Sequence, residues 1–537
     1  MIPPKTNTNT PLTGGNRPVQ RAYDLALIIT AIALPFSNFL MSQGAFLLLF
    51  AWALDRWHNG PIFRDRSWKF WRSQPLLWAI LALFAWQLLG QLWTEDLAQG
   101  WRALRIQLPL LAFPLVLITG RWDQRRGLEL VQHTLAFSVA AACIGALWSG
   151  SAAAEAVEAR DWSPFISHIR FSLMIAFIWS WWLLRAFATK QRKAWVTALI
   201  LCVLGIAFTW KTASITGATL IPLSGLLAFL LARKGGAERR SSNVAFRRNG
   251  SIGLLAVFLA LIAFAMNSLW PRYPNPEELS VKSEGGEQYQ HFPDRCLREN
   301  GGHVWTHIAR SELSEAWNER STIAFEGRDD RNQALEMTLL RYLSSLGLKK
   351  DRPGVLALTP SDVQLIESGV PTVLEVKHGG LRRRWDIVQF EIWNAVDGGN
   401  PSGHSLVQRF LFLKNAFRVF QDQPALGVGT GDVPAAIAAS YEQANSPLAP
   451  EFRLRPHNQY ITFLISGGPL SMLLWMAILV ALVAVSGNAF PTYPFQVACL
   501  AAFIIALSCM TEDTLETQAG VTLAGFLIGL IGKRTIR

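Results

Sequence analysis

The stretch that decides the fold is 459–485, QYITFLISGGPLSMLLWMAILVALVAV, which carries no charged side chain. A helix needs about 20 mostly apolar residues to cross a membrane. Comparable apolar runs recur along the chain, at 23–40, 43–55, 75–93, 104–120, 128–148, 166–187, 195–210, 214–232, 252–270, 493–510 and 517–532. The sequence therefore predicts an all-α polytopic membrane protein with about twelve transmembrane helices.

The overall composition agrees with this fold class. Of the 537 residues, 51% are hydrophobic and only 16% are charged, against about 25% charged in soluble proteins. The net charge is +12, but many lysines and arginines lie in short loops between apolar runs. An excess of basic residues is typical of the cytoplasmic loops of membrane proteins. We therefore expect membrane lipids around the chain and no nucleic-acid partner.

The loop charges predict an orientation. Basic residues cluster in the loops near 56–72, 121–126, 190–193 and 233–248 and at the C-terminus, whereas 94–100 and 511–516 are acidic. With twelve spans, the basic loops share one side, which the positive-inside rule makes cytoplasmic. We expect a bacterial inner-membrane protein with both termini cytoplasmic and one large periplasmic loop. The expected order is a tail 1–22, nine spans in 23–270, a loop domain 271–458, three spans in 459–532 and a tail 533–537.

The polar block 271–458 is predicted to be mostly helical. Residues 334–346 have helical periodicity and precede Gly347, and 362–369 form a second short helix with Thr359 or Ser361 as N-cap. A third, amphipathic helix spans 410–420 and ends before Pro424.

Cations at the expected outer ends of spans are candidates for an anion site. Arg105 opens the fourth span together with Arg102, Arg170 lies one turn into the sixth, and Lys211 ends the seventh. A charge within an apolar segment costs at least about 2.5–3.5 kcal/mol, so it usually faces a partner or a wet cavity. Arginine also matches phosphate oxygens in two-pronged geometry. The alternatives are snorkelling, or pairing of Arg105 with an acidic residue of the 94–100 loop.

A second group of candidates precedes the 459–485 span, where Arg453 and Arg455 are followed by His457 and Asn458. A histidine at the membrane face can act as a general base near neutral pH, although a lone histidine more often has a structural role. The upstream glycine-rich stretch 427–432 lacks the Lys-Ser/Thr ending of a phosphate-binding loop. It predicts a tight turn, which can expose its backbone N–H groups. No metal-binding or cofactor motif is present, so we expect neither group.

Four ordered segments resemble the O-antigen ligase family, which shares its pattern with O-antigen polymerases. They are RFLFLKNAF from Arg409, PALGVGTGD from Pro424, RPHNQY from Arg455 and GGPL from Gly467. The resemblance implies a helical GT-C-like membrane fold. It also implies inverting, metal-independent transfer of a glycan from undecaprenyl diphosphate to lipid A–core at the periplasmic face.

The resemblance assigns roles by motif position. Arg409 and His457 match the family's essential loop arginine and histidine. The family's arginine after the seventh span has no equivalent in 211–217, KTASITG, where Lys211 or Arg170 is the substitute. We expect Arg170, Lys211, Arg105 and Arg455 to bind the diphosphate and Asn458 to help position the acceptor.

The shared motif leaves the acceptor open. A polysaccharide polymerase or a protein O-oligosaccharyltransferase would carry the same pattern. A flippase for the same lipid is disfavoured because such transporters have paired halves and a charged central cavity, whereas these candidates cluster on one side.

Overall fold

The computed structural model describes residues 17–61, 68–152, 165–235, 279–295, 297–489 and 493–533, together with positions 263, 267, 269 and 270. The chain divides into two compact units. The membrane unit comprises Met1–Ser242, Phe412–Ala444 and Arg455–Arg537, and the loop unit comprises Asn243–Leu411 and Asn445–Leu454. The membrane unit thus takes in part of the polar block, including the glycine-rich stretch and the histidine motif.

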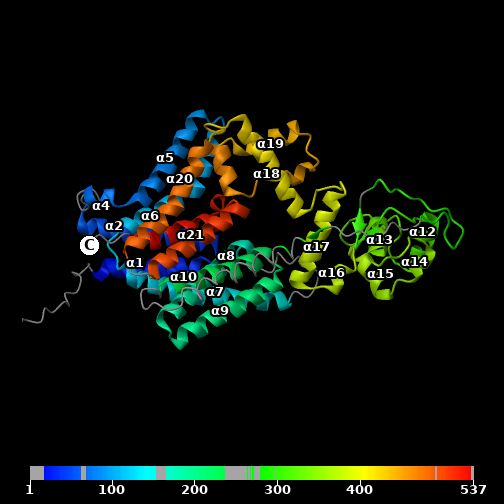
Figure 1. Ribbon diagram of the computed structural model, residues 1–537, viewed down its shortest axis with the longest axis horizontal. Coiled ribbons are helices and arrows are strands. Elements are labelled where there is room, and N and C mark those ends of the chain that lie inside the picture. Colours follow the sequence, from blue (N-terminus) through cyan, green and yellow to red (C-terminus); the bar gives the residue numbers. More distant parts are fainter. Residues whose placement is uncertain are drawn as a thin grey trace, which may run out of the picture. The chain divides into compact units, whose positions relative to one another are not determined.

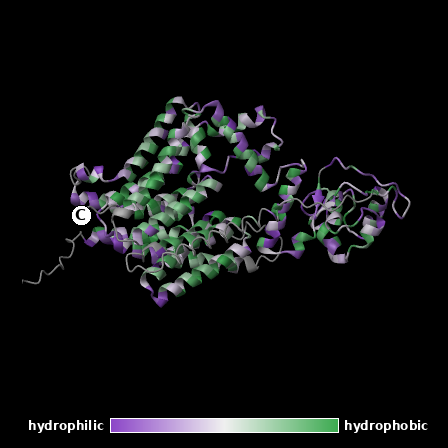
Figure 2. Ribbon diagram, in the orientation of Figure 1, coloured by the Kyte–Doolittle hydropathy of each residue, from purple (hydrophilic) through white to green (hydrophobic). Residues whose placement is uncertain are grey.

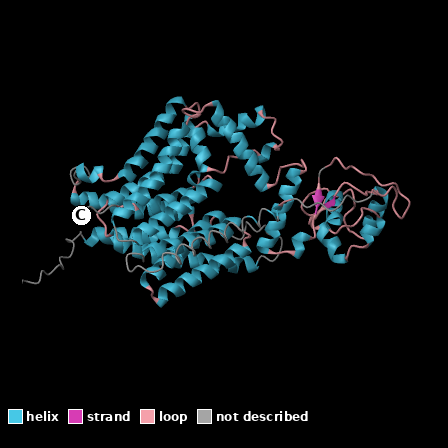
Figure 3. Cartoon of the chain, viewed as in Figure 1, coloured by secondary structure: helices cyan, strands magenta, loops and turns pink. Residues whose placement is uncertain are grey.

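The membrane unit is built from helices, shown in Figure 1 and in cyan in Figure 3. They are α1(Arg17–Ala33), α2(Asn38–Asn59), α4(Trp68–Arg72), α5(Pro75–Leu89), η1(Gly90–Trp93), α6(Leu97–Thr119), α7(Gln124–Ala152), α8(His168–Thr189), α9(Arg192–Lys211), α10(Ile215–Gly235), α19(Val433–Gln443), α20(Gln459–Ala489), α21(Tyr493–Thr511), η3(Thr514–Glu516) and α22(Gln518–Ile531). Helix α18(Ser405–Asp422) crosses the boundary between the units.

Within the described part of the chain, nine helices are long and apolar enough to cross a membrane. They form the green, hydrophobic helices of Figure 2. The prediction of an all-α polytopic membrane protein is therefore confirmed. The count of twelve is not, because α1 and α22 are shorter than a span and the predicted span 252–270 lies almost wholly outside the described residues.

The boundary between the first two predicted spans was wrong. The helices are α1(Arg17–Ala33) and α2(Asn38–Asn59) rather than 23–40 and 43–55. A turn at residues 34–36 separates them, and the Ser37 hydroxyl accepts a bond from the Leu40 amide to cap α2. Hydropathy misses this break because the turn residues, Leu34, Pro35 and Phe36, are themselves apolar.

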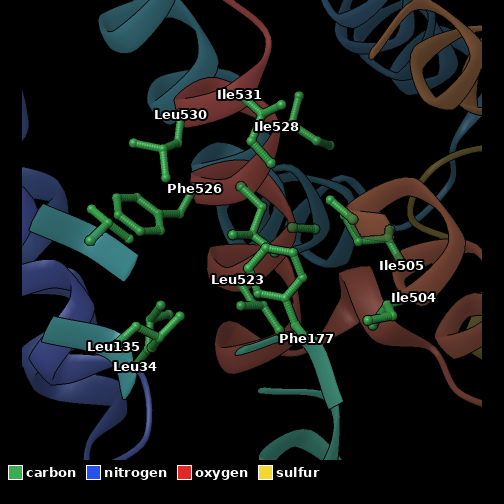
Figure 4. Close-up of a cluster of buried hydrophobic side chains, with 14 of the residues drawn as sticks. Leu34, Leu135, Phe177, Ile504, Ile505, Leu523, Phe526, Ile528, Leu530 and Ile531 are labelled. Atoms are coloured by element: carbon green, nitrogen blue, oxygen red, sulfur yellow. The ribbon is translucent and has the colours of Figure 1, made fainter. Parts of the chain in front are cut away.

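Helix α22 is the most enclosed part of the membrane unit, and nearly all of its residues are buried. Figure 4 shows its side chains Leu523, Phe526 and Leu530 within a cluster that also includes Phe177 of α8. Gly525 and Gly529, four residues apart, let the helix approach the backbone of α6. A Cβ would lie 2.4 Å from the Pro109 carbonyl oxygen at Gly525 and 2.7 Å from the Phe113 carbonyl oxygen at Gly529. Such small-residue spacing is typical of close helix packing in membranes.

Helix α20 packs beside α5 and is broken near its start (Figure 1). Gly467 and Gly468 leave helical geometry, with Gly468 at φ 66° immediately before Pro469. The carbonyl of Gly467 accepts a bond from the indole N–H of Trp86 at 2.8 Å. The GGPL motif therefore makes a kink with a defined partner on α5.

The regular secondary structure of the loop unit is helical, except for one pair of two-residue strands among its described residues, magenta in Figure 3. Its elements are β1(Arg298–Glu299), β2(Gly302–His303), α12(Arg310–Asn318), α13(Leu335–Ser345), α14(Arg352–Leu356), α15(Pro360–Glu367), α16(Leu374–Lys377), α17(Gly380–Val396) and η2(Pro450–Phe452). Helices α13 and α15 confirm two of the predicted helices. Gly347 (φ 72°) follows α13, and Thr359 caps α15 in a reciprocal capping box. Buried side chains such as Trp317 and Tyr342 form a separate core.

Candidate active site

The candidate site lies at the N-terminal end of α20. His457 adopts a left-handed backbone conformation, with φ 49°. Asn458 follows it as the helix cap: its side-chain oxygen accepts from the Ile461 amide at 3.1 Å, and its side-chain nitrogen donates to the Met510 carbonyl at 2.9 Å. The backbone N–H of Asn458 donates to Asp513 at 3.2 Å. The cap therefore ties His457 to the turn between α21 and α22.

That turn carries two buried carboxylates, Glu512 and Asp513, and a third, half-buried one, Glu516. Asp513 also accepts a bond from the Thr462 hydroxyl at 2.8 Å. The side-chain oxygen of Gln459 accepts from the Leu515 amide at 2.9 Å. The first turn of α20 is thus joined to the acidic turn by several hydrogen bonds.

Glu512 stands between two basic side chains. Its Oε2 is 3.6 Å from Nδ1 of His457 and 3.7 Å from a terminal nitrogen of Arg170. The Arg170 side chain is 8% exposed, and its Nε donates to the Thr517 hydroxyl at 3.2 Å. The His457 ring is 32% exposed, and it lies 5.8 Å from the Phe412 ring. Because Nδ1 faces Glu512, Nε2 is the ring nitrogen left for a substrate.

Glu516 forms an ion pair with the second arginine, Arg455. Its Oε2 is 3.6 Å from Arg455, whose side chain is 40% exposed. The other carboxylate oxygen accepts from Gln107 of α6 at 2.9 Å. Burial raises the pKa of the Glu516 carboxyl above its ordinary value, and the Arg455 guanidinium opposes that rise. The acidic turn therefore gathers Arg170, Arg455 and His457.

The glycine-rich stretch 427–432 forms turns, with Gly427 at φ 70° and Gly429 at φ 104°. Contrary to one expectation, four of its six backbone N–H groups have acceptors within the chain, those of Gly427, Val428, Gly429 and Gly431. Those of Val428 and Gly429 bond to carbonyls of α20. The stretch also ends in a structural contact, because Asp432 accepts from the amides of Glu95 and Asp96 at 2.8 Å each. A Cβ at Gly431 would lie 2.2 Å from the Asp96 carbonyl oxygen, which explains a glycine there.

The other predicted residues lie on separate elements. Arg105 is exposed on α6 and forms no ion pair within the described residues, so the suggested pairing with the acidic loop is not seen. Lys211 is exposed at the last residue of α9. Arg409 is half-buried on α18, in the loop unit. Their part in diphosphate binding and catalysis remains a prediction.

Sequence reasoning missed the carboxylates as site residues. It used Glu512, Asp513 and Glu516 only to orient the chain. The available signal was their position, since three acids between two apolar spans are costly unless they face partners. Among the described residues, no group of three or more His, Cys, Asp or Glu side chains is arranged to hold a metal ion.

Part of the chain matches a known protein family. The O-antigen ligase family model matches residues 370–476. The resemblance to the O-antigen ligase family is confirmed. The matched region contains all four sequence segments, including Arg409, the glycine-rich turns, the His457 motif and the α20 kink. No curated protein sequence matches the chain. The match indicates a multi-pass membrane enzyme of the O-antigen ligase or polymerase type.

Proposed function

We propose that this chain is a glycosyltransferase that ligates a glycan from undecaprenyl diphosphate onto lipid A–core at the periplasmic face of the bacterial inner membrane. The observation that carries the proposal is the Glu512 arrangement, in which one carboxylate lies against both His457 and Arg170. His457 belongs to the family domain, and its ring is partly open to a substrate.

The proposed reaction is a single displacement that inverts the sugar carbon. The acceptor hydroxyl oxygen forms a bond to the anomeric carbon while the bond to the diphosphate oxygen breaks. Nε2 of His457 takes the hydroxyl proton, and the electron pair of the broken bond stays on the diphosphate. General-base assistance of this kind contributes about 10²–10⁴-fold to a rate.

The arginines would stabilise the leaving group. Charge grows on the diphosphate as the bond breaks, and one preorganised donor at such a position is worth about 2.7–4 kcal/mol. Arg170 and Arg455 are held in place by Glu512 and Glu516 before any substrate binds. Arg409 is assigned to the same task by its motif position, and Arg105 and Lys211 extend the proposed anion site. Apolar surfaces between the membrane helices would accommodate the polyprenyl tail.

Deletion of the gene, with glycan gels and complementation, tests the proposal. Loss of a ligase leaves full-length polymer on the lipid carrier and unmodified core. Loss of a polymerase leaves core that bears one repeat unit, which would reassign the enzyme within its family. Loss of protein glycosylation with normal lipopolysaccharide would identify a protein O-oligosaccharyltransferase. Normal glycans of every class would contradict the proposal.

A further inference from the structure

The loop unit contains a polar cavity of about 270 Å³ that the proposed reaction does not use. Its walls include two serines, two histidines and two lysines, namely Ser280, Ser344, His303, His307, Lys349 and Lys350. Among the residues that the structure describes, no carboxylate lines it. A cavity with this lining favours an anion with hydrogen-bonding groups around it.

The two lysines bring positive charge to different depths. Lys350 is only 4% exposed, and its ammonium donates to the His303 carbonyl at 2.7 Å. A lysine is rarely buried to this extent. Lys349 is exposed, and its ammonium lies 3.2 Å from the Ser280 hydroxyl and 5.7 Å from the centre of the Tyr289 ring. One ammonium therefore belongs to the wall and the other to the rim.

The backbone holds this pair in place. The Lys350 amide donates to the His307 carbonyl at 3.0 Å, and the Lys350 carbonyl accepts from the Ala309 amide at 2.8 Å. This parallel bridge joins the lysines to the histidine segment. The cavity is therefore preorganised, which reduces the cost of ordering its side chains when a ligand binds.

The histidines supply a rigid, neutral wall. Nε2 of His307 accepts from the Ser280 amide at 3.2 Å, and Nδ1 of His303 accepts from the Trp305 amide at 3.1 Å. Burial lowers the pKa of His303, and the nearby Arg298 lowers it further. The positive charge of the cavity thus comes from the lysines.

The neighbouring carboxylates have partners of their own. Glu299 pairs with Arg341, Asp397 lies 3.4 Å from Arg298, and Asp351 accepts from the Tyr289 hydroxyl at 2.5 Å. Arginines therefore offset the charges of Glu299 and Asp397, and among the described residues the charged side chains that line the cavity itself are the two lysines.

We propose that this cavity binds a sugar unit that carries a carboxylate or phosphate, as part of a glycan that the enzyme handles. The proposal rests on the proposed glycosyltransferase function. Cavities for drug-sized ligands measure about 300–1,000 Å³, so this smaller one suits a single sugar. Serine hydroxyls beside the lysines would meet the sugar hydroxyls, which a free inorganic anion lacks.

Calorimetric titration of the full-length protein in detergent tests this site. The ligands are glucuronate, glucose 6-phosphate, glucose and inorganic phosphate. We expect the two acidic sugars to bind at least about tenfold more tightly than glucose, because charge-assisted hydrogen bonds are stronger than neutral ones. Inorganic phosphate is expected to bind more weakly than either acidic sugar.

Substitutions then assign the binding to the cavity. Lys349→Ala should weaken glucuronate binding about fivefold to tenfold, with a larger loss for Lys350→Met. Lys377→Ala, an exposed lysine at the end of α16, is the matched control and should change nothing. If Lys350→Met does not fold, Lys349→Ala decides the question alone.

Three results would overturn the proposal: equal binding of glucose and glucuronate, phosphate binding tighter than both acidic sugars, or undiminished binding by Lys349→Ala. The titration requires no glycan transfer. A negative result here therefore differs from failure of the proposed function, which glycan gels report.

Discussion

His457 combines an unusual backbone with a specific set of neighbours. Its φ of 49° lies in a region that non-glycine residues seldom adopt. The Asn458 cap, the bond to Asp513 and the Phe412 ring hold the residue there. Such conformations persist only where the surroundings enforce them, and they concentrate at functional sites. The backbone geometry and the sequence motif thus both favour a functional role for His457.

At this scale, we expect His457→Ala and Arg409→Ala each to abolish glycan attachment while the protein still accumulates in the membrane. The first change removes the proposed base, which should cost about 10²–10⁴-fold in rate, and the second removes the motif arginine. His133→Ala on α7 and Arg418→Ala on α18 replace exposed residues of the same types and serve as controls. A normal glycan ladder in either test variant would refute the assignment of that residue.

Glu512→Gln is expected to lower the transfer rate by about 10–100-fold with little change in the amount of folded protein. Glutamine has nearly the same shape but no charge to face Arg170 and His457, and removing one partner from a buried polar group typically costs about 1–3 kcal/mol. Transfer rates in purified membranes measure the effect. Glu442→Gln, on the exposed side of α19, is the control, and an unchanged rate for Glu512→Gln would show that the carboxylate has no role in transfer.

At the scale of elements, the close packing of α22 on α6 links the core of the membrane unit to the candidate site. Gly525 and Gly529 bring the two helices together, and α6 carries Gln107, which donates to Glu516 in the turn before α22. The same helix pair therefore forms part of the core of the membrane unit and supports the acidic turn. Disturbing that packing should affect both stability and the site.

Gly525→Ala should lower the thermal stability of the purified protein, although alanine is by itself the better helix former by about 1 kcal/mol. Its Cβ would lie 2.4 Å from a backbone oxygen of α6, and overpacking typically costs about 1–3 kcal/mol. Thermal unfolding in detergent checks this. In Gly145→Ala the nearest neighbour is a Phe165 ring atom at 3.3 Å, so its unfolding temperature should change less. Equal shifts in the two variants would contradict the packing argument.

At the scale of the whole molecule, the proposed chemistry uses arginines where other sugar transferases use a divalent cation. We expect a chelator to leave the transfer rate unchanged, because Arg170 and Arg455 supply the charge that a metal would otherwise provide at the diphosphate. The measurement is a transfer assay in membranes with and without EDTA. Loss of activity that Mg²⁺ or Mn²⁺ restores would show that a metal takes part.

Much of the architecture was predictable because a membrane helix requires about 20 consecutive, mostly apolar residues, which hydropathy detects. The helices α9 and α20, for example, agree in position with predicted spans. The break between α1 and α2 was not predictable from hydropathy, since a short turn in an apolar stretch leaves the average unchanged. Arg409 and His457 were found through an ordered motif. Glu512 and Glu516 belong to no such motif, and only their partners reveal their role.

By itself, the sequence determined the membrane class, two helices of the loop unit and the resemblance to the O-antigen ligase family, because hydropathy, helix caps and ordered motifs are local properties of the chain. Only the tertiary structure decided which residues meet. The acidic turn after α21 meets His457 at the start of α20, Arg170 on α8 and Gln107 on α6. It does so because burying carboxylates requires basic and hydrogen-bonding partners, and residues far apart in the chain supply them when the helices pack.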